Sequence, residues 1–286
     1  MIFLGTGAAE MVPNPFCTCE VCQYAWAHPE EMRMRSAFQM DEKTVIDFGP
    51  DVFAAAQRFG VHMDKMEDML FTHLHGDHFC FENMDMACMC VPKREKPFRV
   101  HLSQEGYDNL MTLRRAVNAV PGKDDNVKDH IVYDLIPHKV FESFKAGTKT
   151  VLPVRAFHGG AMRPERGVNY RITQEDGKTL LYALDTGVYP EETVEALSGF
   201  PVDILIMDGT FGSRLMDDAC THLDFHTFIS QLDKLTKHGV VTEATKIYAS
   251  HIAHHNHWPT DEYSARLSAA AGREIVVARD GMRIDW

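Results

Sequence analysis

The sequence predicts an α/β fold in which sheets are covered by helices. Short runs of apolar and β-branched residues, typical of strands, recur along the 286 residues, and segments with helical spacing of apolar residues separate them. No internal repeat and no glycine- or serine-rich linker divides the chain, so we expect one domain over residues 1–286. This interleaving over the whole length indicates layers of sheet and helix.

Histidine or aspartate follows several of the predicted strands. Strand-like runs cover residues 2–4, 44–48, 69–72, 151–157, 168–172, 180–184, 204–207, 247–250 and 274–278, and helical spacing covers 104–119, 191–197, 225–237 and 261–271. Histidine or aspartate stands directly after five of these strands: His73, His158, Asp185, Asp208 and His251. Because loops at strand ends commonly carry functional groups, we expect a site at one edge of the sheets.

Composition excludes several classes of protein. With 45% hydrophobic and 24% charged residues, the chain has the composition of a globular protein. We expect no membrane association and a cytoplasmic location, because no apolar run approaches the roughly 18 residues of a span and the opening "MIFLGTG" lacks a signal-peptide pattern. A net charge of −12 makes nucleic acid an unexpected partner.

Three cysteines near the N-terminus predict a metal loop. Cys17, Cys19 and Cys22 lie close enough for their thiolates to converge on one ion, and Pro13 and Pro15 favour a loop over residues 13–25. Three unrelated buried thiols are the alternative. The odd total of seven cysteines argues against a disulfide framework.

The segment "THLHGDH" predicts a second metal centre. His73 and His75 can reach one ion from an extended loop, while Asp77 and His78 can face another. Such crowding of imidazoles and a carboxylate is favourable when a divalent cation is bound.

A two-metal site needs further ligands, and the strand ends provide them. Asp185 is the natural bridge between the ions, and His158 and His251 are the natural terminal ligands. Two cations about 3.5–4 Å apart can share a hydroxide and stabilise charge on a phosphoryl or acyl group. The sequence therefore predicts hydrolysis without a nucleophilic serine, in agreement with the absence of a Gly-x-Ser-x-Gly motif.

These motifs resemble those of the metallo-β-lactamase superfamily. "THLHGDH" resembles its His-x-His-x-Asp-His signature, and "VIDFG" (45–49), "FHGG" (157–160), "LDTG" (184–187) and "SHIAHH" (250–255) follow in the same order. The resemblance implies an αββα sandwich of two mixed β-sheets flanked by helices. It implies one ion on His73, His75 and His158, a second on Asp77, His78 and His251, and Asp185 as the bridge, with Asp77 also counted as catalytic.

The N-terminal stretch is similar to that of PhnP-type phosphodiesterases of phosphonate breakdown, in "LGTGAAEMVPNPFCTCEVCQYA". In that family a structural zinc is held by the three cysteines and by a histidine three residues after the last active-site histidine. The resemblance therefore implies a closed site formed by Cys17, Cys19, Cys22 and His254. His255 is the rival ligand by adjacency.

Phosphodiester cleavage also needs a proton for the departing alkoxide, and histidine is the usual donor. "THLDFH" contains His222 and His226 before a predicted helix. Similarity to the "HL(S/D)" element of superfamily phosphodiesterases favours His222 as general acid or phosphate-oxygen donor. We interpret Asp224 as a carboxylate at the helix N-terminus, with a role in orienting His222 as the alternative.

Two further segments carry weaker hypotheses. Met84, Met86 and Met89 are expected in the core or a pocket wall, with a substrate-covering lid as the alternative. Arg163 and Arg166 follow His158 and are either solvated or in contact with phosphate.

We therefore expect a binuclear, metal-dependent phosphodiesterase (EC 3.1.4-like) that acts on a small anionic phosphodiester, cyclic substrates included. The expected cofactors are two divalent ions, Zn²⁺ or Mn²⁺ with iron as a further option, and one structural Zn²⁺. The alternatives are a lactone or thioester hydrolase on the same metals and a non-catalytic protein whose metals shape a binding surface. The oligomeric state stays open, a homodimer included.

Overall fold

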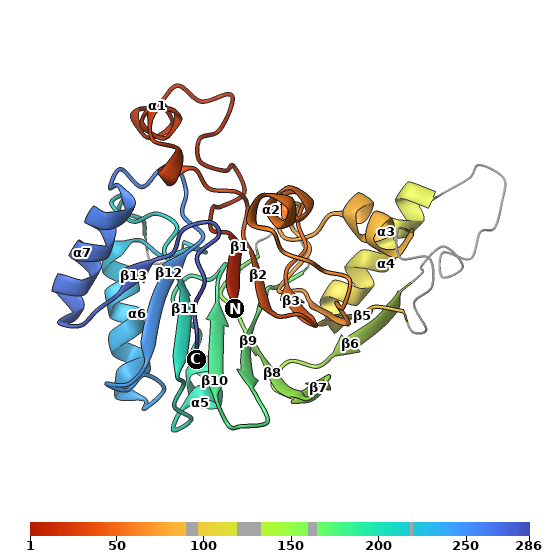
Figure 1. The fold of residues 1–286 in the computed structure, drawn as a ribbon. Helices are drawn as coiled ribbons and strands as arrows, with labels where there is room; N and C mark the ends of the chain where they lie inside the picture. The colour runs from red at the N-terminus through yellow and green to blue at the C-terminus, as the bar shows by residue number, and fades with distance from the viewer. Residues whose placement is uncertain (90–96, 119–132, 160–164, 218–219) are drawn as a thin grey trace.

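Two mixed β-sheets form the centre of the molecule. The structure is a computed structural model that describes residues 1–89, 97–118, 133–159, 165–217 and 220–286 (Figure 1). The first sheet contains, in spatial order, β1 (Ile2–Gly5), β2 (Ala37–Asp41), β3 (Thr44–Ile46), β4 (Asp68–Leu70), β5 (Arg99–Ser103) and β6 (Asp134–His138). The second contains β13 (Val276–Val277), β12 (Lys246–Ser250), β11 (Ile204–Asp208), β10 (Thr179–Ala183), β9 (Val168–Thr173), β8 (Lys149–Arg155) and β7 (Phe144–Ala146).

Helices cover the outer face of each sheet. The first sheet packs against α2 (Val52–Phe59), α3 (Phe81–Met89) and α4 (Gln104–Asn118), and the second against α5 (Glu191–Leu197), α6 (Phe225–Lys237) and α7 (Thr260–Ala271) (Figure 1). Outside these layers lie α1 (Glu20–Ala27) and a short 3₁₀ helix at Pro29–Glu31. The arrangement confirms the predicted αββα sandwich.

Strand β11 shows how the sequence produces these layers. Ile204 and Ile206 point into the core between the sheets, whereas Leu205 and Met207 point into the core under the helices. The strand is apolar throughout because both of its faces are buried, as expected of a parallel strand in the sheet interior. Each such side chain contributes roughly 1.5–3 kcal/mol by leaving water.

The parallel strands of both sheets end at the same edge. Strands β10, β11 and β12 run parallel, and Asp185, Asp208 and His251 stand at or just after their carboxyl ends. Asp185 (φ 52°) and His251 (φ 64°) have left-handed backbone conformations, as does Asp47 (φ 61°) after β3. Such strain in non-glycine residues is held in place by surrounding contacts and concentrates at functional sites.

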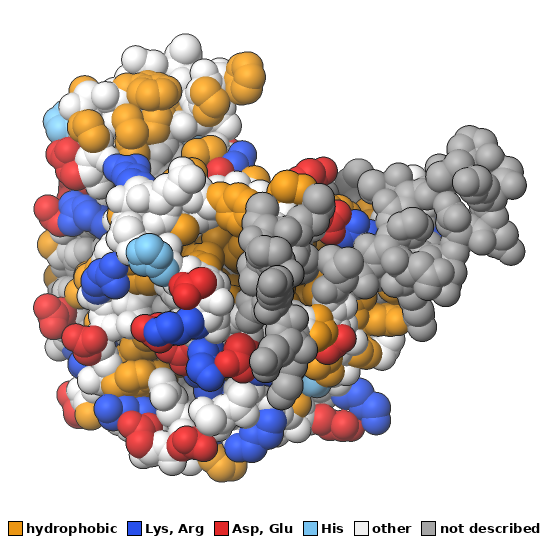
Figure 2. Space-filling view, turned by 45° about the vertical axis from the view of Figure 1, so that its right-hand side comes forward, with side chains coloured by type: hydrophobic (Ala, Val, Ile, Leu, Met, Phe, Trp, Pro, Cys, Tyr) orange, Lys and Arg blue, Asp and Glu red, His pale blue; other side chains and the backbone are white. Residues whose placement is uncertain are grey.

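The segment with the three cysteines projects from this body. It carries exposed rings, with Phe16 98%, Trp26 55% and Tyr24 43% accessible, and Figure 2 shows apolar side chains gathered there. Only Cys22 and Ala25 of helix α1 are buried. The segment therefore has little apolar core of its own.

Helix α3 places the methionines that sequence analysis singled out. Met84 is fully buried in the core under the first sheet, which agrees with the core interpretation, whereas Met86 is 41% exposed. The side chain of Met89 lies outside the described residues. Among the helices of the described segments, none has the length and apolar character needed to cross a bilayer.

Candidate metal centre

Three histidines from two loops form the first group of candidate ligands. His73 and His75 follow β4 and His158 follows β8, and the ligand nitrogens of the three lie within 4.8 Å of one another. His158 Nε2 is 3.1 Å from His75 Nδ1. The Nε2 atom of His73 is buried and has no hydrogen-bond partner in the part of the chain that the structure describes. A buried polar atom without a partner is unfavourable unless a ligand completes the site.

A second group combines two carboxylates with two histidines, all buried. His78 Nε2 lies 3.1 Å from Asp77 Oδ2 and 2.9 Å from Asp185 Oδ2. His251 Nε2 lies 3.1 Å from the same Asp185 oxygen. Despite these short separations, the Nε2 atoms of both histidines and Oδ2 of Asp185 have no partner with hydrogen-bond geometry among the described residues. The donor set fits a divalent cation.

Asp185 stands between the two groups. Its Oδ1 is 4.0 Å from His73 Nε2 and 3.8 Å from His158 Nε2, while its Oδ2 faces the second group. One carboxylate thus presents one oxygen to each group, as a bridging ligand does. The structure brings together every residue predicted for the binuclear site.

Protonation in this cluster suits metal binding. Burial lowers the pKa of His73 and of His158, so both imidazoles are neutral. Burial alone would raise the pKa of Asp185, but the facing histidines hold it well below its usual value. Burial opposes a charge on His78, yet Asp185, Asp77 and Asp47 raise its pKa. A cation can take the place of that proton, since ligand histidines bind in the neutral form.

Asp47 and Thr72 orient His78 and His73 through hydrogen bonds to their Nδ1 atoms. Asp47 Oδ2 accepts a hydrogen bond from His78 Nδ1 at 2.7 Å, and the hydroxyl of Thr72 donates to the same carboxylate. Since that hydroxyl uses its proton on Asp47, it accepts from His73 Nδ1 at 3.0 Å, which leaves the lone pair of His73 on Nε2. Asp47 lies in the "VIDFG" motif, from which no role was predicted for it.

Asp47→Asn is expected to weaken metal binding about 10- to 100-fold, because the amide nitrogen would meet the His78 N–H where a carboxylate oxygen now accepts it. Asparagine tolerates the left-handed backbone at this position, so the loop is retained. Competition with a chromophoric chelator measures the affinity. Unchanged affinity would show that Asp47 does not support the site.

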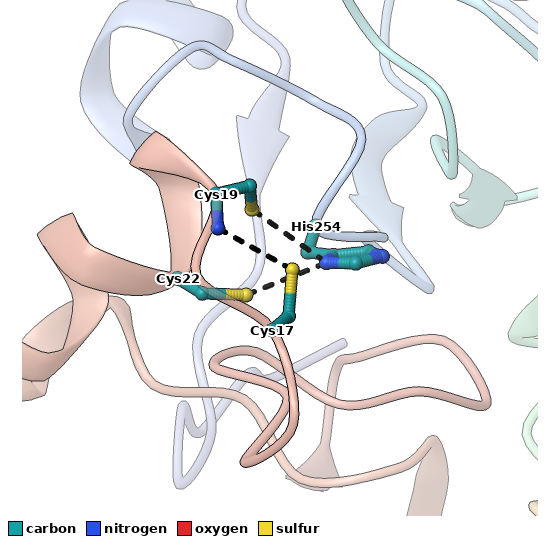
Figure 3. Close-up of side chains that lie close together, drawn as sticks. All are labelled: Cys17, Cys19, Cys22 and His254. Carbon is teal, nitrogen blue, oxygen red and sulfur yellow. Dashed lines mark hydrogen bonds between the residues drawn. The ribbon is translucent and has the colours of Figure 1, made fainter.

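The three cysteines and His254 form a separate group (Figure 3). His254 Nδ1 lies 3.7 Å from Cys19 Sγ and 3.4 Å from Cys22 Sγ, and the ligand atoms of all four residues lie within 4.8 Å of one another. Burial and the neighbouring thiols raise the pKa of Cys22 to about 12, so loss of its proton requires a cation. Part of the predicted loop is helical, since α1 begins at Glu20 and includes Cys22.

The rival ligand, His255, faces elsewhere. Its Nδ1 lies 3.1 Å from Arg214 Nη1, and its ring lies beside Phe211. His254 is therefore the histidine that the structure places against the cysteines. The set of three sulfurs and one imidazole nitrogen fits a closed zinc site.

His222 lies at the rim of the cluster that the two ligand groups around Asp185 form. Its Nε2 is 3.9 Å from Asp185 Oδ1, and its Nδ1 is 2.9 Å from Oδ2 of the buried Asp208. Burial lowers the pKa of His222, but Asp208, Asp185 and Asp77 more than offset this and raise it to about 9. Asp224 caps helix α6 through Thr227, as the helix-terminus interpretation expected. The partner of His222 is thus Asp208, which the sequence predicted at a strand end but without a contact to His222.

The cluster opens into a pocket of about 400 Å³. Its lining comprises Ala8, Ala9, Glu10, His75, Asp77, His158, Asp185, Thr210, Phe211, His222, His251, Ala253, His254 and His255. Arg166 is not part of this lining, and its Nη2 lies 3.5 Å from Glu105 Oε1. Arg163 lies outside the described residues.

The fold and these motifs define a class of metal-dependent hydrolase. Residues 43–252 match the beta-lactamase superfamily domain, and the chain belongs to this family. Within the metallo-β-lactamase superfamily it resembles the PhnP type.

Solved structures share the fold over nearly the whole chain. A diphosphatase of the PhnP family is 23% identical with a TM-score of 0.72, over 100% of this chain and 96% of that one. Zn²⁺-bound PqqB from Methylobacterium extorquens is 18% identical (TM-score 0.71, 100% and 99%), and human short-form tRNase Z is 16% identical (TM-score 0.55, 99% and 98%). At these identities the similarity establishes the fold alone.

Curated relatives match over part of their length. An uncharacterised protein of Mycobacterium tuberculosis is 30% identical over 171 residues, 58% of this chain and 56% of that protein. Coenzyme PQQ synthesis protein B of Methylobacterium nodulans is 23% identical over 238 residues, 73% of this chain and 72% of that protein. The chain thus spans little more than half the length of the mycobacterial relative it matches.

Proposed function

We propose that the protein is a binuclear metal-dependent phosphodiesterase acting on a small phosphodiester, cyclic substrates included. The observation that carries the proposal is the position of the buried Asp185 carboxylate, which presents one oxygen to each of the two ligand groups. Two divalent ions bound there would activate water and stabilise charge on the phosphoryl group. Zn²⁺ and Mn²⁺ both suit these imidazole and carboxylate ligands.

The surroundings of the cluster support a small anionic substrate. The pocket of about 400 Å³ is in the range for a small molecule. The formal charge of −12 disfavours a polyanion such as RNA. A phosphodiester that reaches the ligand groups must therefore be compact.

His222 is the candidate proton donor to the leaving oxygen. Asp208 accepts the Nδ1–H of its ring, so the second nitrogen, Nε2, faces the cluster and can deliver a proton there. The backbone N–H of Thr210 donates to Asp208 Oδ1 at 3.0 Å, which keeps that carboxylate in place. Asp77 and Asp185 remain ionised and accept no proton in this scheme.

A substrate panel tests the proposal against its alternative, a lactone or thioester hydrolase on the same groups. The purified protein is assayed with bis(p-nitrophenyl) phosphate, p-nitrophenyl phosphate, a lactone and a thioester. We expect turnover of the phosphodiester. Hydrolysis of the acyl substrates with none of the phosphodiester would overturn the proposal and support the alternative.

We propose that Cys17, Cys19, Cys22 and His254 hold a structural zinc that stabilises the projecting segment. Cys22→Ser is expected to release one metal per chain and to lower Tm by roughly 4–8 °C, as expected for a loss of about 2 kcal/mol. Cys80→Ser is the matched control, because Cys80 lies outside the group and a serine there retains the hydrogen bond to Glu82. Equal metal content and Tm in the two variants would rule the zinc site out.

A further inference from the structure

Glu10 lies between the cysteine group and the pocket. Its carboxylate Oε1 is 3.8 Å from His254 Nε2, and the residue also lines the pocket that Asp185 faces. Within the described residues, His254 is the only group with which Glu10 forms an ion pair. We propose that Glu10 is a positioning residue that holds the His254 ring for metal binding by the cysteines, an inference that rests on the zinc site proposed above.

The tautomer of the His254 ring decides which partner donates in its contact with Glu10. His254 Nδ1 faces the sulfurs of Cys19 and Cys22. A neutral imidazole has one N–H, so a ring that binds a metal through Nδ1 carries its proton on Nε2. Glu10 Oε1 lies 3.8 Å from Nε2, and we expect the carboxylate to accept this N–H once a metal holds the ring. A carboxylate in this place fixes the tautomer and orientation of a ligand histidine and raises its basicity.

Hydrogen bonds join the backbone near Glu10 to the loop of His254 and to the segment that carries the cysteines. Ala8 N donates to Ile252 O at 3.1 Å, which joins the loop of Glu10 to the loop of His254. Asn14 Nδ2 donates to the carbonyl of Glu10 at 3.0 Å, and Asn14 N lies 3.3 Å from Cys22 Sγ. Glu10 is therefore held against His254 by the same segment that carries the cysteines.

The main alternative is that Glu10 is itself a metal ligand. Glu10, His254 and His255 also have ligand atoms within 4.8 Å of one another. However, His255 Nδ1 accepts from Arg214 Nη1 at 3.1 Å, because a guanidinium only donates. The two roles differ in their tolerance of glutamine. The amide oxygen of glutamine still accepts the Nε2–H of His254, but it replaces a carboxylate ligand poorly.

Cobalt substitution in the whole chain tests the proposal. Co²⁺ bound by cysteine thiolates absorbs by sulfur-to-metal charge transfer, which the histidine and aspartate groups do not show, so the band reports the cysteine site alone. A competing chelator is titrated against the wild type, Glu10→Ala, Glu10→Gln and Glu30→Ala, the last a matched change of an exposed carboxylate. We expect about 10- to 100-fold weaker Co²⁺ binding in Glu10→Ala, and values within about twofold of wild type in the other two.

Each other outcome overturns a stated part of the account. Wild-type affinity in Glu10→Ala, or an equal loss in Glu10→Gln, excludes positioning through the accepted hydrogen bond. Absence of the charge-transfer band in the wild type overturns the zinc site and the role of Glu10 together. A normal band with no phosphodiesterase activity contradicts the enzymatic proposal and leaves the role of Glu10 intact.

Discussion

Asp185→Asn is expected to lower kcat/KM for a phosphodiester by at least about 10³-fold, because one residue supplies an oxygen to both ligand groups. In asparagine, an amide NH₂ that only donates hydrogen bonds replaces one carboxylate oxygen, so one of the two ligand groups loses its oxygen ligand. The backbone of Asp185 is left-handed, which asparagine tolerates, so the substitution tests the carboxylate and not the loop. Metal content measured on the same sample should fall with activity.

Asp233→Asn is the matched control, since Asp233 is an exposed carboxylate on helix α6. It should retain full metal content and activity. If Asp185→Asn also kept its metals and its turnover, Asp185 would not be a bridging ligand, and the two groups would have to act separately.

His222→Ala is expected to lower kcat about 10²- to 10⁴-fold on a phosphodiester with an alkyl leaving group, the usual range for loss of a general acid. The effect should be much smaller for a p-nitrophenyl ester, because p-nitrophenoxide leaves without needing a proton. The Asp208 contact places the ring for this task. Steady-state rates on the two substrates measure the difference.

This dependence on the leaving group separates two roles for His222. A residue that only binds a phosphate oxygen would affect both substrates alike. His226→Ala, an exposed histidine at the start of helix α6, serves as the control and should leave both rates unchanged. Full retention of alkyl-ester cleavage in His222→Ala would exclude the acid role.

The predictable part of the fold consists of elements with strong local patterns. Strands β10 and β11 are apolar throughout because they are buried on both faces, and helix α6 has a clear apolar stripe and cap. Strands β2, β5, β6 and β7 were missed because they are short or carry polar residues, and pairing with neighbouring strands stabilises them. Strand β6 contains Pro137 at a sheet edge, where a missing N–H is tolerated. Helices α1, α2 and α3 also went unpredicted.

The candidate site also contains residues that local spacing reveals and residues that only tertiary packing brings together. His73, His75, Asp77 and His78 share one short segment, so their spacing alone indicates a metal centre. Asp47 and Asp208 support the site from other strands, and only the packing of those strands brings them to their histidines. The sequence indicated Asp208 at a strand end and Asp47 within a motif, but it did not indicate which histidine each one contacts.

The most direct test of the account is a metal titration of phosphodiesterase activity. The catalytic groups are stripped with a chelator, and Mn²⁺ or Zn²⁺ is returned while hydrolysis of a phosphodiester is followed. The account predicts no hydrolysis without metal, a rise that is complete at about two equivalents, and a total of about three metals per chain with the structural zinc. Full hydrolysis by the stripped protein, or none at any metal concentration, would contradict it.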